Sequence, residues 1–201
     1  MIDTIVFDVG NVLVDWNYTS YLDRLGFSDE AKKAVVSAVF QSPVWNSLDE
    51  GTVSPETALK QFIACAPGYE QEIRLAFSGC EDCIHLFPYA VNWVKTLKEK
   101  GYRVLILSNY SEYLFEKTEN KMEFLPLMDG TVFSFRHKMV KPQPQIYRLL
   151  IDSFGLIPEN TVFIDDRQDN VEAAAAFGIH PIRFTGYSHA VEELRKLGIS
   201  C

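Results

Sequence analysis

The 201-residue chain lacks any run of about 18 consecutive apolar residues, so it predicts no membrane-spanning helix. It also lacks the start of a secreted protein. The first residues, MIDTIVFD, carry acids at Asp3 and Asp8, and no basic segment precedes a long apolar stretch. We therefore expect a cytoplasmic protein with no membrane partner.

An excess of positive charge is missing as well. Lysine and arginine total 19 against 27 aspartates and glutamates, which gives a net charge of −8. A surface of this sign repels DNA, RNA and anionic lipid, although one pocket can still be locally positive. The composition therefore predicts no nucleic-acid partner. The oligomeric state cannot be read from the sequence, and a monomer is compatible with it.

Cysteine is scarce. The four residues are Cys65, Cys80, Cys83 and Cys201, and in a reducing compartment they are expected to be thiols rather than disulfides. Cys80 and Cys83 form one C-x-x-C pair, but a structural zinc site needs four ligands and no second pair follows. We interpret the pair as incidental thiols near a loop, and a metal or redox role is the less favoured alternative.

The sequence has no internal repeat, and its apolar residues fall in short segments separated by helical patterns. Four segments read as buried parallel strands because they are apolar or β-branched without clean alternation: 4–7, 102–107, 161–164 and 180–184. Helices are expected after Pro88, after Pro144 and around Val171. Strands that alternate with helices predict an α/β fold with a doubly wound parallel sheet, with ligands beyond the carboxyl ends of the strands.

Residues 16–85 break this alternation. Apolar residues recur at helical spacing after Ser28, which is a plausible N-cap, and again after Ser54 and Pro55. No strand signal lies between them. The segment therefore predicts a helical cap inserted after the first strand, over the expected ligand site. The core domain would then comprise residues 1–15 and 86–201.

Three predicted strands end at polar residues: Asp8, then Ser108 with Asn109, then Asp165 with Asp166. A single aspartate after a strand is usually a turn or cap residue, but three such strand ends side by side are harder to explain in that way. Clustered carboxylates repel one another and need a cation, and hard carboxylate oxygens suit Mg²⁺.

Lys141, just before a predicted helix, offers a second positive charge, although a lysine taken alone is most often exposed.

Four segments resemble the haloacid dehalogenase-like hydrolases in order and spacing: FDVGNVLVD, LSN, KPQPQIY and FIDDRQDN. The resemblance extends from Phe7 to about Phe184. The opening segment is most similar to the bacterial subgroup that includes glucose-1-phosphate phosphatases, and the insertion resembles the helical cap of the family.

The resemblance implies a role for each matching residue. Asp8 would be the nucleophile that forms an aspartyl-phosphate. Ser108 would hydrogen-bond a phosphoryl oxygen with support from Asn109, and Lys141 would balance the charge of Asp8 and the transferring group. The protein would therefore act mainly by positioning groups and neutralising charge.

The implied metal ligands are Asp8, Asp166, the backbone carbonyl of Gly10, and Asp165 either directly or through water. Asn170 would orient the loop or a ligand. Many phosphatases of the family carry a second aspartate two residues after the nucleophile, as general acid and base, whereas this chain has Gly10 there. The missing proton would have to come from water, a cap residue or the substrate itself.

We therefore expect a Mg²⁺-dependent phosphoric monoester hydrolase acting on small phosphorylated metabolites. A hexose 1-phosphate is favoured because an anomeric oxygen leaves with little help from an acid. A carbon–halogen hydrolase and a non-catalytic ligand-binding homologue are the alternatives. The sequence does not identify the substrate, but Trp16, Asn17, Trp45 and the turn 49–51 are candidates to face the pocket.

Overall fold

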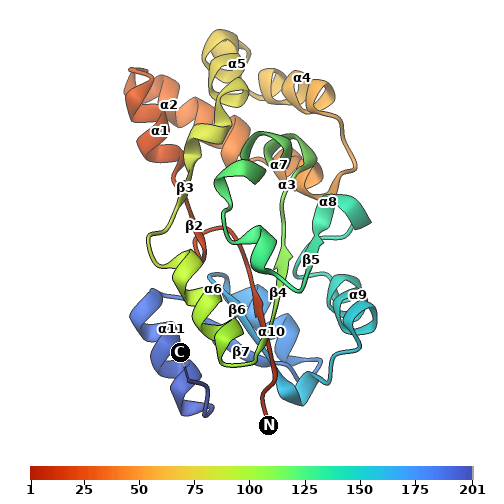
Figure 1. The fold of residues 1–201 in the computed structure, drawn as a ribbon. Coiled ribbons are helices and arrows are strands. Elements are labelled where there is room, and N and C mark those ends of the chain that lie inside the picture. Colours follow the sequence, from red (N-terminus) through yellow and green to blue (C-terminus); the bar gives the residue numbers. More distant parts are fainter. Residues whose placement is uncertain (201) are drawn as a thin grey trace.

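The computed structural model describes residues 1–200 and has a parallel sheet of five strands at its centre (Figure 1). The strand order is β5-β4-β1-β6-β7, and every neighbouring pair is parallel. The strands are β1 (Thr4–Phe7), β4 (Arg103–Ser108), β5 (Gly130–Phe133), β6 (Thr161–Asp165) and β7 (His180–Arg183). The predicted α/β class is confirmed, and the four predicted strands are present.

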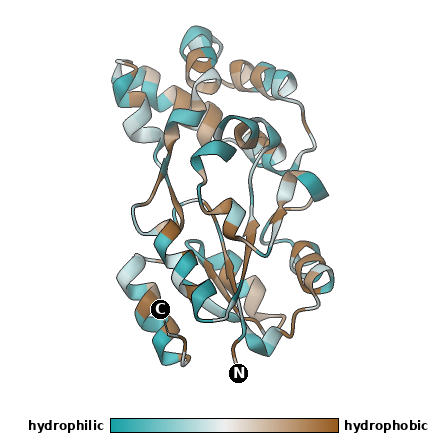
Figure 2. Cartoon of the chain, in the orientation of Figure 1, coloured by the Kyte–Doolittle hydropathy of each residue, from teal (hydrophilic) through white to brown (hydrophobic). Residues whose placement is uncertain are grey.

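Helices cover both faces of this sheet. Phe7 of β1 packs in one apolar cluster with Trp93 of α6 (Ala90–Glu99) and residues of α11 (Tyr187–Lys196). The next residue back, Val6, belongs to a second cluster with residues of α9 (Pro144–Phe154) and α10 (Gln168–Ala175). Successive strand residues thus enter opposite layers, as strand geometry requires. Figure 2 shows the apolar strands enclosed by helices with polar outer faces.

Strand β5 was missed by the sequence analysis. It is a four-residue edge strand whose first two residues are only partly buried, and it passes directly into the short helix α8 (Ser134–His137). An edge strand of this length carries too few apolar residues to be distinguished from a loop by pattern.

The predicted helical insertion is present and forms the end of the molecule beyond the carboxyl ends of the strands (Figure 1). Its helices are α1 (Tyr18–Arg24), α2 (Asp29–Val35), α3 (Pro43–Glu50), α4 (Pro55–Cys65) and α5 (Glu70–Ser78), with a π-helical turn at Val36–Phe40. The predicted N-caps are confirmed, because the hydroxyls of Ser28 and Ser54 accept from Ala31 N and Thr57 N.

A two-stranded antiparallel ribbon joins the insertion to the rest of the chain. It pairs β2 (Val14–Trp16) with β3 (Ile84–Leu86), and Asp15 is opposite His85. The sequence analysis did not identify these two strands, since three-residue strands leave no readable alternation. Between the helices after Ser28 and Ser54 there is no strand, as expected. The predicted boundaries fall inside this ribbon, and the two-domain division itself stays a prediction.

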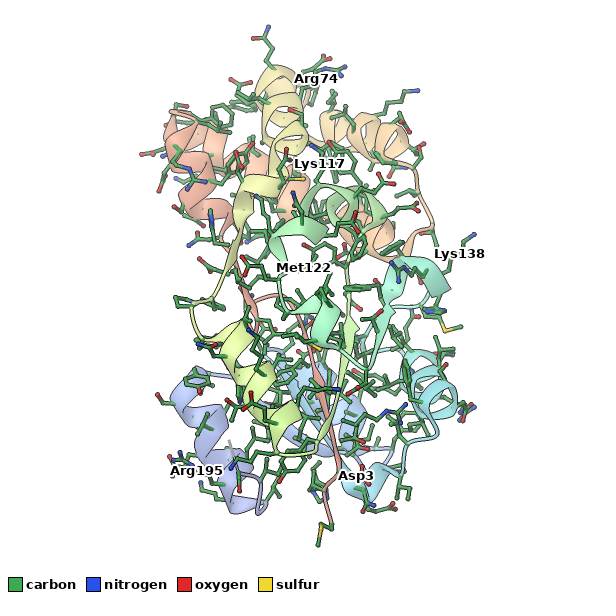
Figure 3. All side chains as sticks on the ribbon, in the orientation of Figure 1. Asp3, Arg74, Lys117, Met122, Lys138 and Arg195 are labelled. Carbon is green, nitrogen blue, oxygen red and sulfur yellow. The ribbon has the colours of Figure 1, made fainter. Side chains whose placement is uncertain are left out.

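Side-chain contacts from α7 (Glu112–Thr118), which follows the insertion in the chain, connect the insertion to the rest of the protein a second time. Lys117 Nζ donates to Ser78 O at 2.8 Å and to Glu81 Oε2 at 3.0 Å. Figure 3 shows Lys117 beneath α5, which carries Arg74 at the far end of the molecule from Asp3. The insertion therefore contacts the rest of the chain at this helix as well as at the two strands of the ribbon.

None of the helices in residues 1–200 combines the length and hydropathy needed to cross a membrane. Cys65, Cys80 and Cys83 are free thiols, and the last two are buried in a 3₁₀ turn (Cys80–Cys83). Burial raises the pKa of Cys80, so this thiol stays protonated. Cys201 lies outside the described residues.

Candidate active site

Asp8 follows β1 at the carboxyl edge of the sheet. Its backbone N–H donates to Ile164 O of β6 at 2.9 Å, which continues the strand pairing to the last residue before the loop. The carboxylate accepts from Val9 N at 2.7 Å, and the residue is 7% exposed. The remaining exposed part lines a pocket of about 290 Å³.

Lys141 lies beside Asp8 and is held there by Asn109. Its Nζ is 2.9 Å from Asp8 Oδ1 and 2.6 Å from Asp165 Oδ2, and its side chain is almost fully buried. Asn109 Oδ1 accepts from Lys141 N at 2.7 Å, and Asn109 Nδ2 donates to Lys141 O at 2.9 Å. Because both ends of this amide are used, Asn109 positions the backbone that carries the lysine.

The two acids at the carboxyl end of β6, Asp165 and Asp166, lie in different environments. Asp165 is fully buried and saturated: it accepts from Lys141 Nζ, from Arg167 N at 2.8 Å and from Asn170 Nδ2 at 3.0 Å. Asp166 is partly buried and accepts from Asn11 Nδ2 at 2.9 Å. Asp166 therefore keeps more of its carboxylate free for a ligand than Asp165 does.

Asp8, Asp165 and Asp166 form a group that could hold a metal ion, since one oxygen of each lies within 4.8 Å of the others. Three carboxylates face the single ammonium of Lys141, which leaves net negative charge in a buried place. Hard oxygen ligands with residual negative charge fit Mg²⁺. Among residues 1–200 no other group meets this criterion, and the cysteine pair is not part of it.

The pKa shifts follow from this crowding. Burial raises the pKa of Asp8; Asp165 and Asp166 raise it further, and Lys141 opposes them. Burial likewise raises the pKa of Asp166, against its hydrogen bond from Asn11. For Lys141 burial acts downward, but Asp165 and Asp8 outweigh it and its pKa is raised, so the lysine stays charged. An additional cation would favour the ionised forms of Asp8 and Asp166.

Two buried polar atoms near Asp8 have no partner among the described residues: Ser108 Oγ and Asn170 Oδ1. Buried polar atoms are normally satisfied by protein, water or ligand, so such atoms at a strand end indicate room for a polar ligand or water. Ser108 ends β4 next to Asp8 but does not line the pocket. Asn170 does line it.

Of the predicted site residues, Asp8, Gly10, Asn109, Lys141 and Asp166 line the pocket, whereas Ser108 and Asp165 lie behind its wall. The structure thus brings together residues from four separate segments of the chain. Whether each has its predicted role stays a prediction.

The insertion contributes the opposite wall of the pocket. Trp16, Trp45 and Asp49 line it as expected. Asn17, Glu50 and Gly51 do not: Asn17 caps α1 by accepting from Ser20 N at 2.9 Å, and Gly51 ends α3 in the left-handed conformation, with φ of +73°. For these three residues the expectation of a pocket position was wrong, since they act at helix ends.

Sequence reasoning missed Asn11 and Arg167. Asn11 has a φ of +57° and uses its side chain twice, toward Asp166 and as acceptor for Trp16 N at 3.2 Å. Asn11 thus connects Asp166, one of the acids that could hold a metal ion, to Trp16 at the start of the insertion. Arg167 lines the pocket and pairs with Asp169 at 2.7 Å. A single asparagine after Gly10 gives no sequence signal of such a contact.

We expect Lys141→Met to lower the free energy of unfolding by about 3 kcal/mol at neutral pH, because it leaves the carboxylates of Asp8 and Asp165 buried without their cation. Urea unfolding measures this. The loss should shrink as the pH falls and Asp8, whose pKa is raised, takes up a proton. Lys95→Met, at an exposed position, is the control; equal stability of the two variants would contradict the proposed charge balance.

The chain is similar to known proteins over most of its length. The family model for haloacid dehalogenase-like hydrolases matches residues 2–178. A sesquiterpene phosphatase of Aspergillus oryzae is 24% identical over 193 residues, covering 96% of this chain and 94% of the relative. A D-ribitol-5-phosphate phosphatase of Bacteroides thetaiotaomicron is 27% identical over 190 residues, covering 89% of each.

Among solved structures, a HAD family enzyme of Bacteroides thetaiotaomicron, in complex with magnesium and inorganic phosphate, superimposes with a TM-score of 0.72. The two are 21% identical, and the match covers 94% of this chain and 99% of that one. At this identity the likeness establishes the fold.

Proposed function

The chain belongs to the haloacid dehalogenase-like hydrolases, and on that premise we propose that it is a Mg²⁺-dependent phosphatase of small phosphorylated metabolites. The observation that carries the proposal is the ion-paired cluster at the sheet edge: Asp8 opens into the pocket while Lys141 and two further acids surround it. The experiment that tests it is phosphate release from about a hundred phosphate esters with Mg²⁺.

In this proposal Asp8 attacks phosphorus and forms an aspartyl-phosphate, which water then hydrolyses. Lys141 favours the ionised form of Asp8 and offsets charge on the transferring group, because its Nζ lies 2.9 Å from the attacking carboxylate. Asp165 and Asn109 hold the lysine in place. Ser108 Oγ, buried and without a protein partner, is available to a phosphoryl oxygen after a small local movement.

The residues present fit the metal. Asp8, Asp166 and the Gly10 carbonyl would hold Mg²⁺. The oxygens of Asp165 already accept hydrogen bonds from Lys141, Arg167 and Asn170, so Asp165 would instead hold Lys141 and the loop in position. When bound, the ion neutralises the phosphate and orients it for in-line attack. A solved relative with this fold carries magnesium and inorganic phosphate, which supports the assignment.

Residues 16–85 act as the cap in this proposal. Trp16 and Trp45 place apolar surface against the pocket, and their ring centroids are 5.4 Å apart. A polar phosphate end and a partly apolar cap wall suit an organic phosphate monoester. The relatives of this chain include a sesquiterpene phosphatase and a D-ribitol-5-phosphate phosphatase, so the cap is the place where substrate choice would differ.

For the substrate we propose a sugar phosphate, with a hexose 1-phosphate favoured over a 6-phosphate. The anomeric hydroxyl is more acidic than the others, so it leaves more readily. We expect kcat/KM for glucose 1-phosphate to exceed that for glucose 6-phosphate, measured side by side with Mg²⁺. Equal or better kcat/KM for the 6-phosphate would refute this preference without affecting the phosphatase assignment.

A carbon–halogen hydrolase is the competing reaction, since the family also contains dehalogenases. A metal-independent reaction on carbon has no use for the acids around Lys141, and the cluster therefore favours phosphoryl transfer. A non-catalytic homologue would bind phosphate esters and release none.

A further inference from the structure

The proposed reaction needs a proton donor that the loop after β1 does not provide. An ester oxygen leaves slowly unless it is protonated as its bond to phosphorus breaks, and attacking water must give up a proton. Gly10 has no side chain at the position where many phosphatases of the family carry the acid. A side chain that donates this proton would therefore have to come from another element that reaches the same pocket.

Asp49 of α3 reaches it. The residue is partly buried and lines the pocket together with Asp8 and Lys141, one helical turn after Trp45, which lines it as well. Side chains four residues apart share one helix face. Asp49 therefore belongs to the cap wall opposite the sheet edge, on the side of the pocket where the leaving group of an ester held by Asp8 would lie.

The turn that carries Asp49 is fastened to the sheet domain. Ser134 Oγ donates to Asp49 O, and Gln143 Nε2 donates to Glu50 Oε1 at 3.2 Å. Gly51 packs so closely that a Cβ there would lie 2.7 Å from Phe135 O. These contacts fix Asp49 relative to the Lys141 loop, as a proton donor requires.

The surroundings of Asp49 keep its proton in place. Burial raises the pKa of Asp49 to about 8, and the charge of Asp8 adds to this; Lys141 and the backbone N–H of Ser111 act in the opposite direction. The carboxyl also lies in the last turn of α3, where the helix dipole disfavours an anion.

The other titratable groups near this carboxyl are Tyr110 and Cys80, whose own pKa values its charge raises. Neither is charged at neutral pH. Asp8 differs from Asp49 in having the Lys141 ammonium at 2.9 Å. Of Asp8 and Asp49, the ion-paired Asp8 is suited to be the ionised nucleophile and Asp49 to keep its proton.

We propose that Asp49 is the general acid and base of the phosphatase reaction proposed above, on which this inference rests. In the first step an Asp8 oxygen bonds to phosphorus and the bond to the ester oxygen breaks. The ester oxygen keeps the electron pair, takes the proton of Asp49 and leaves as the alcohol.

In the second step the ionised Asp49 takes a proton from water as the water oxygen bonds to phosphorus. The bond to Asp8 breaks, and its electron pair returns to the Asp8 carboxylate. Inorganic phosphate leaves, Asp49 is protonated again, and one water has been consumed for each ester.

The test is the dependence of kcat/KM on the leaving group, measured with substituted phenyl phosphates of similar shape. General acid catalysis is worth about 10²–10⁴-fold and is needed least by a good leaving group. Asp49→Asn should therefore lose at least about tenfold more activity on phenyl phosphate than on p-nitrophenyl phosphate. In the wild type, activity on phenyl phosphate should fall above about pH 8 as Asp49 ionises, and Asp49→Asn should lack this limb.

Two variants separate proton transfer from a structural effect. Glu30→Gln removes an exposed carboxylate from α2 of the insertion and should leave the ratio of the two rates unchanged. Gly10→Asp in the Asp49→Asn background should restore activity on phenyl phosphate, because a Cβ at Gly10 meets no atom within 4 Å.

Equal losses on both esters in Asp49→Asn, or none, would overturn the proposal. If that variant does not fold, a wild-type pH profile identical for the two esters overturns it. Failure of the phosphatase assignment would look different: the wild type would release phosphate from neither ester. If Asp8→Asn is inactive and the wild type is active, the assignment stands and the leaving-group ratio alone decides on Asp49.

Discussion

Replacing Asp8 by asparagine should lower turnover by about 10³-fold or more while the protein stays folded. The substitution preserves the shape of the side chain, and Asn can still accept from Val9 N. What it removes is the nucleophilic oxygen and the charge that pairs with Lys141. A covalent route through an aspartyl-phosphate cannot proceed from a neutral amide.

The measurement is phosphate release at saturating substrate, with circular dichroism and thermal unfolding as checks of the fold. Asp15→Asn is the matched control, because Asp15 comes from the same part of the chain but lies in the β2–β3 ribbon. It should keep most of the wild-type rate. An Asp8→Asn enzyme that kept a tenth of that rate would refute the covalent mechanism.

The sheet and most of the cluster were predictable because they depend on local rules. A short apolar run that stops at a polar residue places that residue at the carboxyl end of a strand, and parallel strands bring such ends together. This was enough to predict that Asp8, Asp165 and Asp166 meet. It was also enough to predict a cation, since like charges in one place require one.

The contacts that shape the site were not predictable in this way. Asn109 was expected to support a phosphate contact, yet its amide holds the backbone of Lys141, 32 residues away. The position of Asp49 depends on how α3 is oriented by Ser134 and Gln143, which are remote in sequence. Long-range side-chain contacts of this kind follow from tertiary packing and leave no period or motif in the sequence.

Removal of the metal ion is expected to have the second large effect on activity. We expect excess EDTA to reduce phosphatase activity to background and Mg²⁺ to restore it. A phosphate dianion entering the pocket adds negative charge beside Asp8, Asp165 and Asp166, where Lys141 is the buried cation. Without a divalent ion, Asp8 responds by taking up a proton, as its raised pKa indicates, and a protonated Asp8 is a poor nucleophile.

The choice of ion and one substitution sharpen this test. Ca²⁺ should bind but support little activity, because its larger and looser shell places the phosphate less well for in-line attack. Asp166→Asn should raise the Mg²⁺ concentration needed for half-maximal activity, since Asp166 is the acid with most of its carboxylate free. Asp169→Asn, which loses an exposed pair with Arg167, should leave this concentration close to the wild-type value. Full activity in EDTA would refute the metal requirement and would favour a reaction on carbon instead.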